Sequence, residues 1–183
     1  MARLPSYTRE TLDEAQRAVW DRIASGARGG VSGPFTALIT SAELCARVEQ
    51  LGVFIRYECS VPQRLRELAI LTVGRHWRAD YEWYAHAPIA ERIGISPAVI
   101  QAIGRGEPPP FETEPDRLVH AFVAELLATG QVADATYAPV QKLLGDKGIV
   151  ELTGLAGYYS LLALQLNAFQ VAAPESVAIP WWG

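Results

Sequence analysis

The chain has 183 residues, of which 50% are apolar and 20% are charged, with a formal net charge of −4. This composition predicts one folded domain over residues 1–183, and the acidic balance argues against binding to nucleic acid or to an anionic membrane. The two cysteines and three histidines are too few for a zinc ribbon, a disulfide scaffold or a histidine-rich metal centre, so we expect no metal and no bound cofactor.

The pattern of apolar residues and turn signals predicts an all-α fold of about seven to eight helices. The first helix is expected over residues 11–24 and ends at Gly26. Because this amphipathic segment contains acids and arginines and does not resemble a targeting signal, we expect a cytoplasmic protein. A glycine-rich connector or lid follows over residues 26–33, and residues 1–40 together form an N-terminal helical extension.

Three capping signals place the middle helices. Ser41 precedes an apolar stripe, Ser60 with Gln63 forms a capping-box pattern, and Asp80 caps or begins the helix after that. These helices are expected over residues 42–57, from Ser60 to about residue 77, and from Asp80 to residue 93 before Gly94.

The last third of the chain contains the most apolar segment. Its helices are expected over residues 96–104, 114–129 with Thr113 and Asp116 as the capping signal, 134–144, and 146–169. The apolar run over residues 149–169 approaches the length of a membrane span, but it contains Glu151 and lacks basic flanks, so we interpret it as a buried central helix. The tail, residues 174–183, is expected to be extended, with Trp181 and Trp182 packed on the body of the protein or on a neighbouring subunit.

Three titratable residues on two successive predicted helices form the strongest candidate site: Glu67, Glu82 and His86. Glu82 and His86 are four residues apart and share one face of a helix. A carboxylate can orient an imidazole for proton transfer, and the aromatic residues nearby would exclude water. The alternative is a solvated ion pair between Glu82 and His86, with Glu67 bound to Arg64 or Arg66 on its own helix.

The segment from Arg64 to His86, followed by Gly94-Ile95-Ser96, resembles the carboxymuconolactone decarboxylase family of the alkylhydroperoxidase D-like superfamily. In the peroxidase branch a Glu is followed by a C-x-x-C pair and then by a His. Counted from Glu67, the two cysteine positions are Ala79 and Glu82 here, and the His is His86. The chain therefore resembles the branch without these cysteines, which argues against peroxidase activity through a reactive thiol.

The resemblance implies decarboxylation or a proton shift on a small carboxylated lactone or related carbonyl compound, without a cofactor. It implies His86 as the main acid–base residue, Glu82 as its orienting group or a second proton carrier, and Glu67 as the end of the relay. Candidate pocket residues are the walls Tyr57, Tyr81 and Trp83, and Arg56 or Arg75 as a clamp for a carboxylate. The family also implies a homo-oligomer, often a trimer or hexamer.

Two other functions fit the same residues. The three titratable groups would also serve an isomerase, a hydratase or a different lyase, because each needs a proton moved beside a carbonyl. The chain could instead be a non-catalytic protein whose pocket holds a small ligand.

Overall fold

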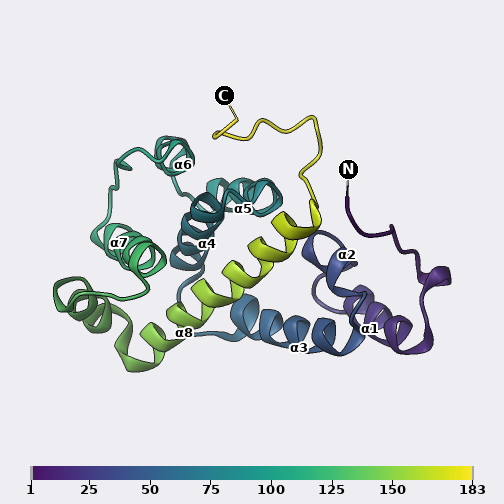
Figure 1. Cartoon of the computed structure of the whole chain (residues 1–183). Helices are drawn as coiled ribbons and strands as arrows, with labels where there is room; N and C mark the ends of the chain where they lie inside the picture. The colour runs from purple at the N-terminus through teal and green to yellow at the C-terminus, as the bar shows by residue number, and fades with distance from the viewer. Residues whose placement is uncertain (1, 183) are drawn as a thin grey trace.

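The computed structural model describes residues 2–182, and every regular element in that range is a helix (Figure 1). The predicted all-α class is therefore confirmed. The elements are the short 3-10 helix η1 (Arg9–Thr11), α1 (Glu14–Ser25), α2 (Pro34–Leu38), α3 (Ala42–Val53), the π-helical turn η2 (Phe54–Glu58), α4 (Gln63–Trp77), α5 (Asp80–Arg92), α6 (Pro97–Arg105), α7 (Glu114–Thr129) and α8 (Asp134–Phe169).

The long helix α8 runs through the centre of the molecule, with α1 to α3 on one side and α4 to α7 on the other (Figure 1). α8 packs against α2, α4 and α7, and α4 also packs against α5 and α6. The apolar stripe of α8 explains this position, because Leu152, Leu155 and Leu162 are buried in the core. α8 is long and apolar enough to cross a membrane, yet more than half of its most apolar window is buried, as expected for a central core helix.

Gly145 divides α8 into two helical parts that meet at a kink. Its backbone angles are φ 70° and ψ 174°, a conformation that glycine adopts without the steric cost of a Cβ. The two helices predicted over residues 134–144 and 146–169 therefore correspond to the two parts of α8.

Two of the predicted helix starts are wrong. The first helix begins at Glu14 instead of Thr11, because the Asp13 carboxylate accepts a hydrogen bond from the backbone N–H of Gln16 at 2.8 Å and closes a capping box there. Ser60 does not cap α4, whose N-cap is Pro62. The Ser60 hydroxyl and backbone N–H instead donate to Glu151 on α8, each at 2.6 Å.

The region between residues 26 and 58 also differs from the prediction. Residues 34–38 form the short helix α2, directly after the predicted connector, and no helix was predicted for them. The helix expected over residues 42–57 has no side-chain cap from Ser41 and becomes a π-helical turn at Phe54. The backbone N–H of Cys59 donates to the Phe54 carbonyl at 2.9 Å, which closes this wider turn.

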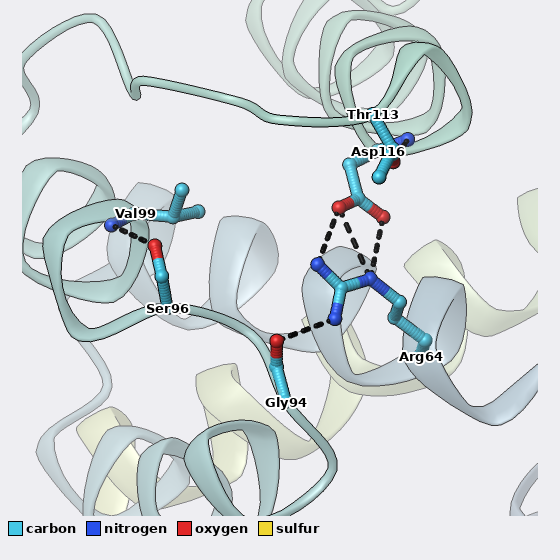
Figure 2. A network of polar contacts seen from close by, with 6 residues as sticks. All are labelled: Arg64, Gly94, Ser96, Val99, Thr113 and Asp116. Atoms are coloured by element: carbon cyan, nitrogen blue, oxygen red, sulfur yellow. Dashed lines mark hydrogen bonds and ion pairs between the residues drawn. The ribbon is translucent and has the colours of Figure 1, made fainter.

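An arginine on α4 joins three parts of the chain. Arg64 donates to both carboxylate oxygens of Asp116 on α7, at 2.7 to 3.1 Å, and to the Gly94 carbonyl at 2.7 Å (Figure 2). At the start of α7 the Thr113 hydroxyl accepts from the backbone N–H of Asp116 at 3.3 Å, as the capping pattern predicts. This network fixes α4, which carries Glu67, against α7 and the end of α5.

The C-terminal tail packs on the same protomer. The indole N–H groups of Trp181 and Trp182 donate to the Asp80 carboxylate at 2.9 and 3.0 Å. Asp80 is the first residue of α5, so the tail holds the beginning of the helix that carries Glu82 and His86.

Candidate active site

The packing of α4 against α5 brings Glu67 next to His86, although the two residues are 19 positions apart in the sequence. The Glu67 Oε2 and His86 Nδ1 atoms lie 2.7 Å apart. The two side chains are only 7% and 5% exposed, so solvent screens this contact little. An ionised Glu67 accepts the Nδ1–H, which leaves Nε2 as the ring nitrogen that can exchange a proton with another group.

Glu82 lies on the other side of the same imidazole. Its Oε2 atom is 3.6 Å from His86 Nε2, and its side chain is 5% exposed. Burial raises the pKa of the Glu82 carboxyl above its ordinary value, although the charges of His86, Arg56 and Arg28 act in the opposite direction. The carboxyl can therefore carry a proton at a higher pH than an exposed glutamate can.

Glu82 and His86 face a cavity of about 110 Å³ in the described structure. α5 contributes these two side chains and Tyr81, while α8 contributes Tyr159 and Leu162. The rest of the wall comes from η2 and from the N-terminal segment: Arg56, Arg28, Gly30, Ser32, Pro34 and Phe35. Glu67 is not in the cavity wall, so it acts on the site through His86.

Two arginines place positive charge at the cavity. Arg28 donates from Nη2 to the Tyr158 hydroxyl at 3.0 Å and stacks over the Phe35 ring at 4.3 Å. Its Nε atom is buried and has no hydrogen-bond acceptor among the described residues. Arg56 comes from the π-helical turn and has no ion-pair partner within residues 2–182. The cavity therefore offers cationic donors to an anionic group of a ligand.

Tyr159 also lines the cavity and adds a hydroxyl group to it. The residue is 1% exposed, and its ring lies edge-on to His86 with the ring centroids 5.2 Å apart. The hydroxyl is buried without a partner in the part of the chain that the structure describes. Burial raises the pKa of this hydroxyl well above its ordinary value, so Tyr159 stays protonated and can donate a hydrogen bond.

Two glycines let the N-terminal segment close over the cavity. Gly33 has φ 56°, and a Cβ there would collide with the Tyr81 ring. A Cβ at Gly52 would collide with the Tyr158 hydroxyl and the Arg28 guanidinium. Side chains at these two positions would displace a cavity wall or one of its cations.

The structure brings five of the eight sequence-predicted site residues together: Glu67, Glu82, His86, Tyr81 and Arg56. The other three lie elsewhere. Tyr57 is 47% exposed and donates to the Ala27 carbonyl at 3.4 Å, Trp83 is buried in a separate apolar cluster, and Arg75 lines a different cavity. None of these three side chains lines the cavity that Glu82 and His86 face.

Sequence reasoning missed Arg28 and Tyr159. Arg28 lies in a glycine-rich connection 54 positions before Glu82 in the chain, and no periodic pattern links the two. The signal available for Tyr159 was its place in the Gly157-Tyr158-Tyr159 motif on the central helix.

The alternative in which Glu67 pairs with an arginine of its own helix does not hold. Arg64 is bound to Asp116, and Arg66 donates to the Cys59 and Val61 carbonyls at 3.4 and 3.2 Å. The contacts among Glu67, Glu82 and His86 are buried instead of solvated.

The site offers neither a reactive thiol nor a metal-binding cluster. Cys45 and Cys59 are buried and do not line the cavity, and burial raises the pKa of the Cys45 thiol to about 11. Among residues 2–182 no three His, Cys, Asp or Glu side chains are grouped to hold a metal ion. Glu67 and Glu82 contact different ring nitrogens of His86, so they lie on opposite sides of the ring.

Comparisons with known proteins identify the fold. No protein-family model matches the chain. No curated protein matches it either. One similar solved structure is that of an uncharacterized peroxidase-related protein from Ralstonia eutropha JMP134, which is described as an alkylhydroperoxidase AhpD core. It superimposes on this chain with a TM-score of 0.76 at 13% sequence identity, and the match covers 95% of this chain and 93% of that one. An uncharacterized peroxidase-related protein from Silicibacter sp. TM1040 superimposes with a TM-score of 0.71 at 14% identity, over 96% of this chain and 92% of that one. The likeness shows that the chain has the alkylhydroperoxidase D-like fold.

Proposed function

We propose that this protein is an enzyme that, like carboxymuconolactone decarboxylases, performs acid–base chemistry without a bound cofactor on a small carboxylated lactone or related carbonyl compound. The observation that carries the proposal is the buried arrangement Glu67–His86–Glu82, with contacts of 2.7 and 3.6 Å and two of its members facing a cavity. Buried titratable groups with a raised pKa in a cavity are typical of sites that transfer protons.

The arginines determine how the substrate is oriented. An arginine paired with a carboxylate stabilises its charge, which opposes the loss of that carboxylate as carbon dioxide. The leaving carboxylate therefore faces the apolar side chain of Leu162, away from the Phe35 ring that Arg28 covers, and a second anionic or carbonyl group binds Arg28 and Arg56. The substrate class is accordingly a carboxylated compound with a second carbonyl or carboxylate.

The reaction then needs one proton and no oxidant. The bond to the leaving carboxylate breaks, carbon dioxide departs, and the electron pair remains on the substrate as an enolate. Tyr159 donates a hydrogen bond to the enolate oxygen, and Glu82 delivers its proton to the carbon. His86 then takes up a proton from solvent at Nε2 and passes it to Glu82, while Glu67 keeps its hydrogen bond with the Nδ1–H, so the proton consumed in the reaction comes from solvent.

A proton shift is the second candidate reaction. Glu82 and His86 Nε2 are 3.6 Å apart and both line the cavity. One group can remove a proton from a carbon next to a carbonyl while the other supplies one, which is the chemistry of an isomerase. The two reactions differ only in whether carbon dioxide is released.

A thiol-based peroxidase mechanism is not part of this proposal, although both similar structures are described as peroxidase-related. At the sequence positions of the peroxidase cysteines this chain has the buried Ala79 and the carboxylate of Glu82. Neither side chain can attack a peroxide and resolve the product.

We also propose that the protein works in the cytoplasm as a homo-oligomer, a trimer or hexamer, without nucleic-acid or membrane partners. An assembly would cover the exposed apolar side chains of Leu51 on α3 and of Val150 and Leu164 on α8, which are 47%, 69% and 49% exposed.

A substrate screen tests the proposed function. Carboxylated lactones and β-keto acids would be incubated with the protein, and carbon dioxide release and deuterium uptake from heavy water would be measured. We expect turnover that His86→Ala and Glu82→Gln reduce by about 10² or more, while the matched control His76→Ala, at an exposed histidine, retains it. Binding of these compounds without turnover would support the non-catalytic alternative, and turnover unaffected by His86→Ala would refute the proposed mechanism.

A further inference from the structure

A second cavity, of about 210 Å³, lies between α4, α6 and α7 and shares no lining residue with the candidate active site. Its apolar wall includes Ile103, Ala124 and Leu127, and its polar groups include Arg75 and His120. Pockets for drug-sized ligands measure about 300 Å³ or more, so this cavity fits a smaller molecule.

Arg75 supplies the cavity with an unpaired cation. Its Nε atom is buried without a hydrogen-bond acceptor, and the guanidinium has no ion-pair partner in the described range 2–182. A buried N–H donor that lacks an acceptor is costly unless a ligand supplies one.

The fold holds this guanidinium in place. Arg75 lies 5.9 Å from the Trp181 ring centroid, within the range of a cation–π contact. On another side it packs on the backbone of Gly106, where a Cβ would lie 2.7 Å from Nη2. Gly106 has φ 71° and ends α6, so both the turn and the space for Arg75 require glycine.

His120 provides a second oriented group. The Thr72 hydroxyl donates to the Leu68 carbonyl at 2.8 Å, so it can only accept from His120 Nδ1, which lies 3.0 Å away. The imidazole therefore carries its proton on Nδ1, and Nε2 remains an acceptor. Burial lowers the pKa of His120, so the neutral imidazole is favoured.

The charge at this cavity favours an anion. Glu107 is the carboxylate in its wall, and Arg105 holds that carboxylate at 2.9 Å. Arg75 is thus the wall residue whose formal charge is not compensated by an ion pair within the described residues.

We propose that this cavity binds a small organic carboxylate with an apolar body, such as a single ring or a short chain. The carboxylate accepts hydrogen bonds from Arg75, the apolar body packs against Ile103 and Leu127, and His120 accepts from a hydroxyl group where the ligand has one. This site is separate from the proposed substrate cavity and does not depend on the proposed reaction.

Isothermal titration calorimetry with benzoate and hexanoate tests the proposal. Because Arg28 and Arg56 would also attract an anion, the titrations use the full chain with Arg28→Gln and Arg56→Gln. We expect this background protein to bind at least one of the two carboxylates and to bind neutral benzyl alcohol more weakly. Adding Arg75→Gln should weaken carboxylate binding by about tenfold or more, because a charge-assisted pair is lost. The matched control Arg92→Gln removes the same charge from an exposed position on α5 and should change nothing.

Two further variants guard against an unfolded Arg75→Gln protein. Arg75→Lys keeps the charge but loses the planar fork, and it should weaken binding of both carboxylates a few-fold. Thr72→Val removes the acceptor that orients His120, and it should leave binding unchanged because neither benzoate nor hexanoate has a hydroxyl group for His120 to accept from. Amide chemical-shift changes on titration should fall on α4, α6 and α7. Failure of both carboxylates to bind a folded background protein, equal binding by the Arg75 variants, or shift changes confined to other helices would each overturn the proposal.

Discussion

Replacing Glu67 separates its structural role from its proposed role in proton transfer. Glu67 is bound to His86 at 2.7 Å, and neither side chain is more than 7% exposed. Glu67→Ala leaves His86 Nδ1 without its acceptor in a buried place, which we expect to cost about 3–5 kcal/mol of the free energy of unfolding. Because small proteins are stable by about 5–15 kcal/mol in total, this variant would be only marginally folded.

Glu67→Gln is the more informative change. The amide oxygen can still accept the Nδ1–H, so only the difference between a charge-assisted and a neutral hydrogen bond is lost, about 1–1.5 kcal/mol. Turnover should nevertheless fall by about 10² or more, because a neutral amide does not stabilise the imidazole when it carries the transferred proton.

The assay pairs urea unfolding with the pH dependence of kcat/KM. Glu49→Gln is the matched control, since Glu49 is also a buried carboxylate, paired with Arg22 at 3.2 Å, and does not line the cavity. We expect both variants to lose stability and only Glu67→Gln to change the pH profile. A Glu67→Gln protein with the wild-type profile and rate would refute the reasoning.

Three other predictions follow from the geometry of the site. Gly52→Ala should weaken activity, because the new Cβ displaces the Arg28 guanidinium. It should also lower the free energy of unfolding by about 1–3 kcal/mol, since the collision with Tyr158 costs more than the gain of about 1 kcal/mol in helix propensity. Urea unfolding measures the sign of this net change. Burial raises the pKa of Glu82, so the folded protein binds the Glu82 proton more tightly than the unfolded chain does. The contribution of this proton to the free energy of unfolding is present at acidic pH. It is lost as the pH rises from the ordinary pKa of a glutamate through the raised pKa of Glu82. Glu82→Gln should therefore gain stability relative to wild type as the pH rises towards neutral, whereas a difference that is constant with pH would contradict the raised pKa. Tyr159→Phe should bind substrate with little change in KM but lower kcat, because its hydroxyl acts on the developing enolate; an unchanged kcat would remove this donor from the mechanism.

Two features that depend on interactions within a few residues were predicted correctly from the sequence, whereas one that depends on a long-range contact was not. Thr113 caps α7 and Gly145 divides α8 as the sequence predicts, because both effects act within a few residues of the chain. Ser60 has the same local signal as Thr113, but a long-range partner, Glu151, takes its hydroxyl. A capping signal therefore predicts a helix start only where no distant group competes for the cap residue.

The same distinction applies to the candidate site. Glu82 and His86 share a helix face, so their proximity follows from a spacing of four residues. The contact between Glu67 and His86 depends on how α4 packs against α5. The sequence pattern placed the two residues on successive helices, but not within hydrogen-bond distance of each other.

The sequence by itself determined the helical class, most helix positions, the absence of the peroxidase cysteine pair, and the identity of the three titratable groups. Only the tertiary structure decided that these groups are buried around a single imidazole, that Arg56 and not Arg75 lines their cavity, and that Arg28 and Tyr159 join them. The physical reason is that helix periodicity and capping depend on neighbours along the chain, whereas burial and the chemistry it controls depend on side chains that helix packing brings together from distant positions.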